Sequence, residues 1–140
     1  MKLRLITFGK TKKGPHQAIA AEYIERLGRY LPFEFITVKN DEEIVKRLAP
    51  GDYLVVCDEH GREMDSKEFA ELIEERQVRS TKYLTFVIGP AAGLSAMLKT
   101  KAKLNLSFSR FTIQHDLALI VLLEQLYRAC TIIKGEKYHK

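Results

Sequence analysis

Side chains suited to acid–base and anion-binding chemistry gather near the end of the chain, around a long apolar run. His115 precedes this run, which covers residues 117–123, and the polar sequence Glu-Gln-Leu-Tyr-Arg follows it at 124–128. The chain then closes with Tyr-His-Lys at 138–140. Histidine titrates near neutral pH, and the planar guanidinium of arginine suits phosphate and carbonyl groups. The pattern predicts a polar site at the margins of a buried helix.

The same side chains also have ordinary structural explanations. A histidine near a chain terminus, such as His139, is usually solvated. Arg128 follows Glu124 by four residues, a spacing at which the two can pair on a helix surface. His115 could be a satisfied histidine at a helix start. The residues alone leave a catalytic and a structural role open for each of them.

The apolar run belongs to a predicted helix over residues 117–133, which contain no Gly or Pro. At ~1.5 Å per residue this helix is about 25 Å long. Its first two turns are apolar on every face, so we expect them to be buried on every face. A small domain seldom covers such a helix alone, which favours a second subunit as the missing wall. The alternative is a central core helix in a monomer.

Length and composition indicate one soluble globular domain over residues 1–140. Hydrophobic residues make up 46% and charged residues 29%. No apolar stretch reaches the ~18 residues of a membrane span, and the start is too short and strand-like for a signal peptide, so we expect a cytoplasmic protein. The two cysteines, Cys57 and Cys130, lack metal spacing, so we expect buried thiols and no metal. The net charge of +5 only slightly favours a polyanion such as RNA.

Strand and helix patterns alternate along the chain, which predicts an α/β domain with a mainly parallel sheet. Apolar runs bounded by turn residues predict the strands 2–8, 33–38, 53–58, 83–88 and 104–108. Helical spacing and capping residues predict the helices 16–31, 41–48, one starting at 65–68, 94–102 and 117–133. We expect residues 58–61 to form a turn after the third strand.

Ligands of open α/β sheets bind outside the carboxyl ends of the strands. Three strand ends are unusual here, at residues 56–58, 88–93 and 107–114. The small residues of the second let the backbone approach a flat ligand. The basic loop at 9–15 lacks the order of a nucleotide P-loop and is either solvated or in contact with an RNA backbone.

Several motifs resemble the RlmH family of the SPOUT superfamily over the full length of the chain. They are Ile88-Gly89-x-x-x-Gly93-Leu94-Ser95, Leu106-Ser107-x-Ser109-x-x-Thr112, His115-x-Leu117, Glu124-Gln125-Leu126-Tyr127-Arg128-Ala129 and the terminal Tyr138-His139-Lys140.

The resemblance implies a SPOUT-type fold, in which the C-terminal third threads through a loop to form a trefoil knot, and a homodimer. It also implies binding of S-adenosylmethionine in the knot loops. The implied reaction is methylation of the ring nitrogen at position 3 of a pseudouridine in large-subunit ribosomal RNA, with the assembled ribosome as substrate.

The resemblance further assigns roles to particular residues. Substrate and catalytic positions correspond to Arg128, Tyr138 and His139, and the tail of one subunit is expected to reach the cofactor pocket of the other. The cofactor loops correspond to Cys57 at the first strand end, to Gly89, Pro90 and Gly93 at the second, and to Ser109, Arg110, Phe111, Thr112, Ile113 and Gln114 at the third.

The chain departs from the family pattern where Pro90 and Gln114 stand in place of Gly and Pro, and where Leu119 stands in place of Arg. Proline has no N–H to donate, and leucine removes a cationic contact. Three rival functions follow: a SPOUT enzyme with another RNA target, a ribosome-binding module without catalysis, and a flavodoxin-like small-molecule binder.

Overall fold

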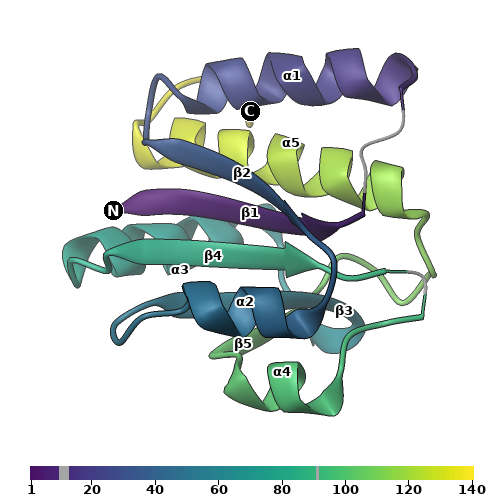
Figure 1. The fold of residues 1–140 in the computed structure, drawn as a ribbon. Helices are drawn as coiled ribbons and strands as arrows, with labels where there is room; N and C mark the ends of the chain where they lie inside the picture. Colours follow the sequence, from purple (N-terminus) through teal and green to yellow (C-terminus); the bar gives the residue numbers. More distant parts are fainter. Residues whose placement is uncertain (10–12, 91) are drawn as a thin grey trace.

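A computed structural model describes residues 1–9, 13–90 and 92–140, where five strands form one sheet with every pairing parallel (Figure 1). The order across the sheet is β2-β1-β4-β3-β5. The prediction of an α/β domain with a mainly parallel sheet is confirmed. Part of the predicted basic loop, 10–12, and residue 91 in the small-residue loop lie outside the described residues. The strands are β1 (Lys2–Phe8), β2 (Phe33–Val38), β3 (Tyr53–Glu63), β4 (Tyr83–Ile88) and β5 (Leu104–Ser107).

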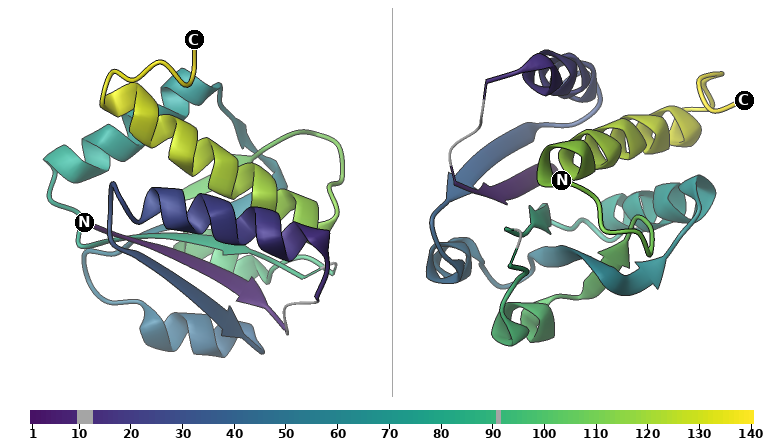
Figure 2. Two further views of the ribbon diagram at one scale, coloured as in Figure 1. Left: turned by 90° about the horizontal axis from the view of Figure 1, so that it is seen from above. Right: turned by 90° about the vertical axis from the view of Figure 1, so that its right-hand side faces the viewer.

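Helices cover both faces of the sheet (Figures 1 and 2). On one face α5 lies between α1 and α3 and contacts both, and α2 and α4 lie on the other face. None of the helices in the described ranges is long and apolar enough to cross a membrane. The helices are α1 (Pro15–Leu27), α2 (Asp41–Arg47), α3 (Ser66–Val78), α4 (Ala96–Lys101) and α5 (His115–Ile133).

Alternation along the strands builds a separate core on each face of the sheet. In β4, Phe86 packs in the core under α3 and α5, whereas the next residue, Val87, packs in the core under α2 and α4. This follows because successive side chains of a strand point to opposite faces. The larger core contains an edge-on contact between the rings of Phe69 and Phe86, whose centroids are 5.8 Å apart. Two covered faces explain why the central strands are apolar throughout.

Helix α5 is the most buried helix, although its first turns are not covered on every side. Leu122, Leu123 and Leu126 are fully buried. In contrast, the Leu117 residue is 56% exposed, and Ile120 and Val121 are half-buried. The single chain therefore leaves part of the helix uncovered, because α1 and α3 flank it without enclosing it, and the expectation that a second subunit covers this part stays a prediction.

Two other boundary predictions differ from the structure. Helix α1 ends at Leu27 rather than at residue 31, because Gly28 begins a turn in which the N–H of Leu31 donates to the Leu27 carbonyl at 3.1 Å. The predicted turn at 58–61 is wrong, since these residues continue β3 through a register shift against β5. Gly61 permits this path, because a Cβ there would lie 2.5 Å from the Asn105 carbonyl oxygen.

Replacement of Gly61 by alanine tests this close backbone approach. We expect Gly61→Ala to lower the free energy of unfolding by about 1–3 kcal/mol, because the strands must separate to admit a methyl group. Gly28→Ala is the matched control. Its Cβ would have its nearest contact at 3.5 Å, and its φ of −59° suits alanine. We expect this control to be neutral or stabilising by about 0.4–1 kcal/mol in urea unfolding. Equal stabilities of the two variants would contradict the close approach.

Candidate functional site

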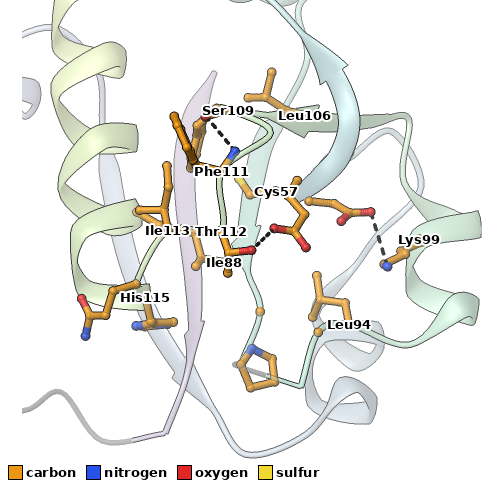
Figure 3. A pocket seen from close by; sticks show the side chains of 18 residues that line it. Cys57, Ile88, Leu94, Lys99, Leu106, Ser109, Phe111, Thr112, Ile113 and His115 are labelled. Atoms are coloured by element: carbon orange, nitrogen blue, oxygen red, sulfur yellow. Dashed lines mark hydrogen bonds and ion pairs between the residues drawn. The ribbon is translucent and has the colours of Figure 1, made fainter.

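A cavity of about 690 Å³ opens at the carboxyl edge of the sheet, where β4 and β5 end and β3 passes through its register shift, beside the start of α5 (Figure 3). Every residue predicted to bind the cofactor lines it except Arg110. The lining members of that set are Cys57, Gly89, Pro90, Gly93, Ser109, Phe111, Thr112, Ile113 and Gln114. The three strand ends meet here because parallel strands place their carboxyl ends at one edge.

The loop after β4 forms one wall and leaves little space behind itself. A Cβ on Gly89 would lie 2.6 Å from Leu94 Cγ, so a larger residue there would push Leu94 from its place. Gly93 adopts a left-handed φ of +83°, which disfavours other residues. Its N–H donates to the Pro90 carbonyl at 2.8 Å. The carbonyl that Pro90 retains is thus already used to close the loop.

Short side-chain hydrogen bonds hold the opposite wall, the loop after β5. The Thr112 hydroxyl donates to Glu59 Oε2 at 2.7 Å, and the Ser109 hydroxyl accepts from the Phe111 N–H at 3.0 Å (Figure 3). The loop then enters α5 through Gln114, whose side-chain oxygen caps the helix by accepting the N–H groups of residues 116 and 117. These bonds fix the wall without a bound partner.

Arg110 is the predicted cofactor residue that does not line the cavity. Its side chain is 90% exposed and lies 3.9 Å from Glu63. Its neighbour Phe111 lines the cavity although it is 83% exposed. An aromatic side chain left so exposed at a cavity mouth is available to a ligand or to another chain.

The cavity interior is largely apolar, with few polar groups. Burial raises the pKa of the Cys57 thiol, so this group stays neutral. At the rim, Lys99 lies 3.4 Å from Asp58. Flat apolar walls with a few polar groups suit a small molecule that carries an aromatic ring. The lining residues outside the predicted set are Asp58, Glu59, Ile88, Leu94, Lys99, Leu106, Phe108, His115 and Ala118.

His115 joins the cavity wall to helix α1 through Asp116. His115 Nδ1 lies 3.5 Å from one Asp116 carboxylate oxygen, and His16 Nε2 of α1 lies 3.7 Å from the other. The Gln114 amide donates to the same carboxylate at 3.2 Å and is the main reason that the pKa of Asp116 is lowered, with His115 and His16 contributing. His115 therefore lies at the start of α5, as predicted, and its role stays a prediction.

The other predicted residues gather at the far end of α5. Glu124 Oε1 accepts from Arg128 Nε at 3.0 Å, from Arg128 Nη2 at 2.6 Å and from the Tyr138 hydroxyl at 3.1 Å. Arg128 Nη1 lies 3.2 Å from His139 Nδ1. Arg128 therefore pairs with Glu124, as its spacing predicts, and also touches the tail; its catalytic role stays a prediction.

These contacts determine the charges of the side chains in this cluster and the positions of their hydrogen atoms. The hydrogen bond that Arg128 donates to the Glu124 carboxylate raises the pKa of Arg128, so the guanidinium stays cationic. A guanidinium can only donate, so His139 Nδ1 accepts and Nε2 carries the ring hydrogen. Burial raises the pKa of Tyr138 to about 12, and Tyr23 and Glu124 add to the shift. The cluster therefore contains a guanidinium, an imidazole N–H and a phenol whose hydrogen is donated to Glu124.

The two groups of predicted residues are far apart within one chain. Arg128 lies thirteen residues along α5 from His115, which is about 20 Å at the helical rise of ~1.5 Å per residue. None of Arg128, Tyr138 and His139 lines the cavity. Because the helix is stiff, it keeps the two groups apart. The residues of the family motifs therefore form two separate clusters within one chain. Within residues 1–9, 13–90 and 92–140 there is no group of three or more Cys, His, Asp or Glu side chains that could hold a metal.

The family described as predicted SPOUT methyltransferase matches residues 1–139. The chain belongs to this family. Its relatives include proteins named ribosomal RNA large subunit methyltransferase H. The one from Cytophaga hutchinsonii is 39% identical, and the one from Caldicellulosiruptor bescii is 36% identical; each match covers 99% of both chains. The one from Streptococcus pneumoniae is 34% identical over 100% of both chains. The resemblance to the RlmH family is confirmed.

Solved structures of SPOUT methyltransferases share the fold. The SpoU methyltransferase AviRb from Streptomyces viridochromogenes, in complex with AdoMet, has a TM-score of 0.57 at 15% identity, covering 96% of this chain and 58% of that one. A probable methyltransferase from Bordetella pertussis has a TM-score of 0.61 at 14% identity, covering 91% of this chain and 95% of that one. The SPOUT-type sheet flanked by helices is thereby confirmed.

The Asp116 cluster yields a pH-dependent prediction. Its carboxyl has a pKa below the ordinary value of 3.8 in the folded chain, so the cluster stabilises the fold above that pH. The contribution is lost as pH falls through the folded pKa. We expect Asp116→Asn to be less stable than the native chain at pH 7, with the difference shrinking towards pH 2–3. Urea unfolding across this range measures it. A difference that stays constant with pH would contradict the assignment.

Proposed function

We propose that the protein is an S-adenosylmethionine-dependent methyltransferase that methylates the ring nitrogen at position 3 of a pseudouridine in 23S (large-subunit) ribosomal RNA. We further propose that it acts on assembled ribosomes, hence in the cytoplasm, as a homodimer with a C-terminal trefoil knot. Family membership and the names of the full-length relatives support a ribosomal RNA substrate. The finer points rest on the resemblance and on the arrangement of this chain's residues.

The separation of the two groups along α5 carries the proposal of a composite site. Arg128 lies ten residues along α5 from Ala118, the last residue of the helix that lines the cavity, which is about 15 Å at ~1.5 Å per residue, and Tyr138 and His139 cluster with Arg128. A second copy can bring its own donors to this cavity. Leu117, exposed on the first turn of α5, offers part of an apolar surface for such a copy. We infer that each active site takes its cavity from one chain and its donors from the other.

The cavity fits the proposed cofactor. A Cβ on Gly89 would lie 2.6 Å from Leu94 Cγ, so the wall has no room for a side chain at this position. Ile113 and Ile88 provide apolar surface for an adenine ring. When bound, S-adenosylmethionine supplies an electrophilic methyl group on a sulfonium. The residues of the cavity would bind and orient it, and in-line positioning supplies much of the rate in such displacements.

The donors suit the other reactant. A uracil ring nitrogen must give its proton to a base, here solvent, before its lone pair can attack the methyl group, and the negative charge of the deprotonated ring spreads onto the flanking carbonyl oxygens. Arg128, always cationic, and the N–H of His139 could both stabilise this anion. In the observed contact, His139 faces Arg128 with its basic nitrogen. This supports a donor role over the general-base role that its usual pKa would favour.

A ribosome-binding protein without catalysis is the second candidate. It is favoured by Leu119, which is buried in the core under α5 and so offers no cation where the family often has arginine. The carbonyl of Pro90 is also engaged within its loop. The experiment below separates this candidate from the enzyme.

Mixing two inactive variants tests both the activity and the composite site. Gly89→Val should fill the cavity wall, and Arg128→Ala should lower methyl transfer from labelled S-adenosylmethionine to ribosomes by about 10²–10³-fold. After joint unfolding and refolding, half of the dimers are mixed and one of their two sites is intact. We expect about a quarter of native activity to return.

Arg79→Ala, at an exposed pair with Glu75 on α3, is the matched control and should keep native activity. If the mixture stays inactive while each variant still dimerises, the site is not shared between chains. If the native chain binds ribosomes without transferring methyl, the non-catalytic candidate holds.

The role of His139 is tested by comparing two replacements. Glutamine keeps an N–H donor near the position of Nε2, and alanine removes it. If His139 acts as a hydrogen-bond donor, we expect His139→Gln to retain at least about ten times the kcat of His139→Ala. As a general base, it predicts equal losses of about 10²–10⁴-fold and a rate that falls below pH ~6.5. Single-turnover methyl transfer across pH 5.5–8.5 distinguishes the two roles.

A further inference from the structure

Helix α1 and the turn after it hold the C-terminal tail through four tyrosines, here called the tyrosine cluster: Tyr23, Tyr30, Tyr127 and Tyr138. The ring of Tyr127, on α5, lies at the centre. Its centroid is 6.1 Å from those of Tyr23 and Tyr30 and 4.8 Å from that of Tyr138. Edge-on and tilted pairs at these distances are favourable. The tail residue Tyr138 therefore packs on a surface that α1 and α5 build together.

A hydrogen bond from Tyr30 adds a polar contact between the turn after α1 and the tail. The Tyr30 hydroxyl donates to Glu136 Oε2 at 2.8 Å and so joins residues 106 positions apart. Burial and the bonded Glu136 carboxylate together raise the pKa of Tyr30 to about 12, so the phenol keeps its proton and remains a donor. The accepting residue, Glu136, lies two residues before Tyr138.

The chain leaves α5 in a direction set by a left-handed turn. Gly135 has a φ of +72°, its N–H donates to the Ile132 carbonyl at 3.0 Å, and the Glu136 N–H donates to the Thr131 carbonyl at 2.9 Å. This pair of bonds is the Schellman arrangement that ends many helices. It fixes the backbone as far as Glu136. Beyond this point, the hydrogen bond between the Glu136 side chain and Tyr30 is the first contact that holds the tail on its path to His139.

We propose that Tyr30 is a positioning residue for methyl transfer: by holding Glu136, it sets where Tyr138 and His139 stand. The inference rests on the proposed function, because it assumes that those two side chains meet the substrate. Tyr30 touches neither substrate nor cofactor, and it does not line the cavity. It acts through a tail whose other anchors in the described residues are Glu124, Arg128 and the ring of Tyr127.

Tyr30→Phe tests the proposal, because it removes one hydroxyl and keeps the ring that packs on Tyr127. Trypsin can release the last three residues by cleavage after Lys137, whose local sequence the variant leaves unchanged. A net hydrogen bond corresponds to about a 2- to 10-fold change in the open fraction of the tail. The cleavage rate follows this fraction when closing is fast. We expect cleavage to accelerate by this factor, as measured by mass spectrometry.

Turnover is the second readout. We expect the kcat for methyl transfer to ribosomes to fall by about 2- to 10-fold in Tyr30→Phe. The affinity for S-adenosylmethionine, measured by calorimetry, should not change. Glu136→Gln keeps an acceptor for the hydroxyl and should retain most of the native kcat. Tyr83→Phe, which removes a hydroxyl from β4, should leave both cleavage and turnover native.

An unchanged cleavage rate in Tyr30→Phe overturns the proposal, and so does faster cleavage with native turnover. Trypsin cleavage does not depend on methyltransferase activity. It therefore still tests the hydrogen bond between Tyr30 and Glu136 if the native chain transfers no methyl group. In that case the proposed function fails by itself, and with it the assignment of Tyr30 to methyl transfer.

Discussion

The stiffness of helix α5 is the constraint on which the rest of the structure depends. The helix is anchored along its length by leucines that are fully buried against the sheet, α1 and α3. It begins in the wall of the cavity and ends beside the donors of the tail. A helix so packed cannot shorten, so the distance between cavity and donors is set by its nineteen residues. The composite site proposed above would therefore take its cavity from one chain and its donors from another.

Two different kinds of structure support the two halves of the site. The cavity is framed by three strand ends and by loops closed with short internal hydrogen bonds, such as that from Thr112 to Glu59. The donors stand on a short tail, held by one carboxylate, a tyrosine ring contact and the bond from Tyr30. A framed pocket suits a cofactor that must be oriented. A tail held by a few weak contacts can adjust to a large substrate, since each contact contributes only a small free energy.

Much of the fold was predictable because the signals are local. The apolar strands gave the parallel sheet, and Asp65 with Glu68 gave the start of α3, where the structure shows both bonds of a capping box. The errors arose where a distant partner decides. Residues 58–61 look like a turn but extend β3, because Gly61 lies against the backbone of β5. The exposed Leu117 shows that apolar composition predicts burial only when the covering surface belongs to the same chain.

The sequence by itself determined the family, the order of the strands and helices along the chain, and the residue types available for chemistry, because these depend on spacing and on side-chain identity. Only the tertiary structure decided that nearly all the predicted cofactor residues share one cavity while Arg110 points away. It also decided that Arg128, Tyr138 and His139 form a separate cluster bound to α1 through Tyr30 and Glu136. Contacts between residues 106 positions apart leave no periodic trace in a sequence, since they depend on how whole helices and strands pack.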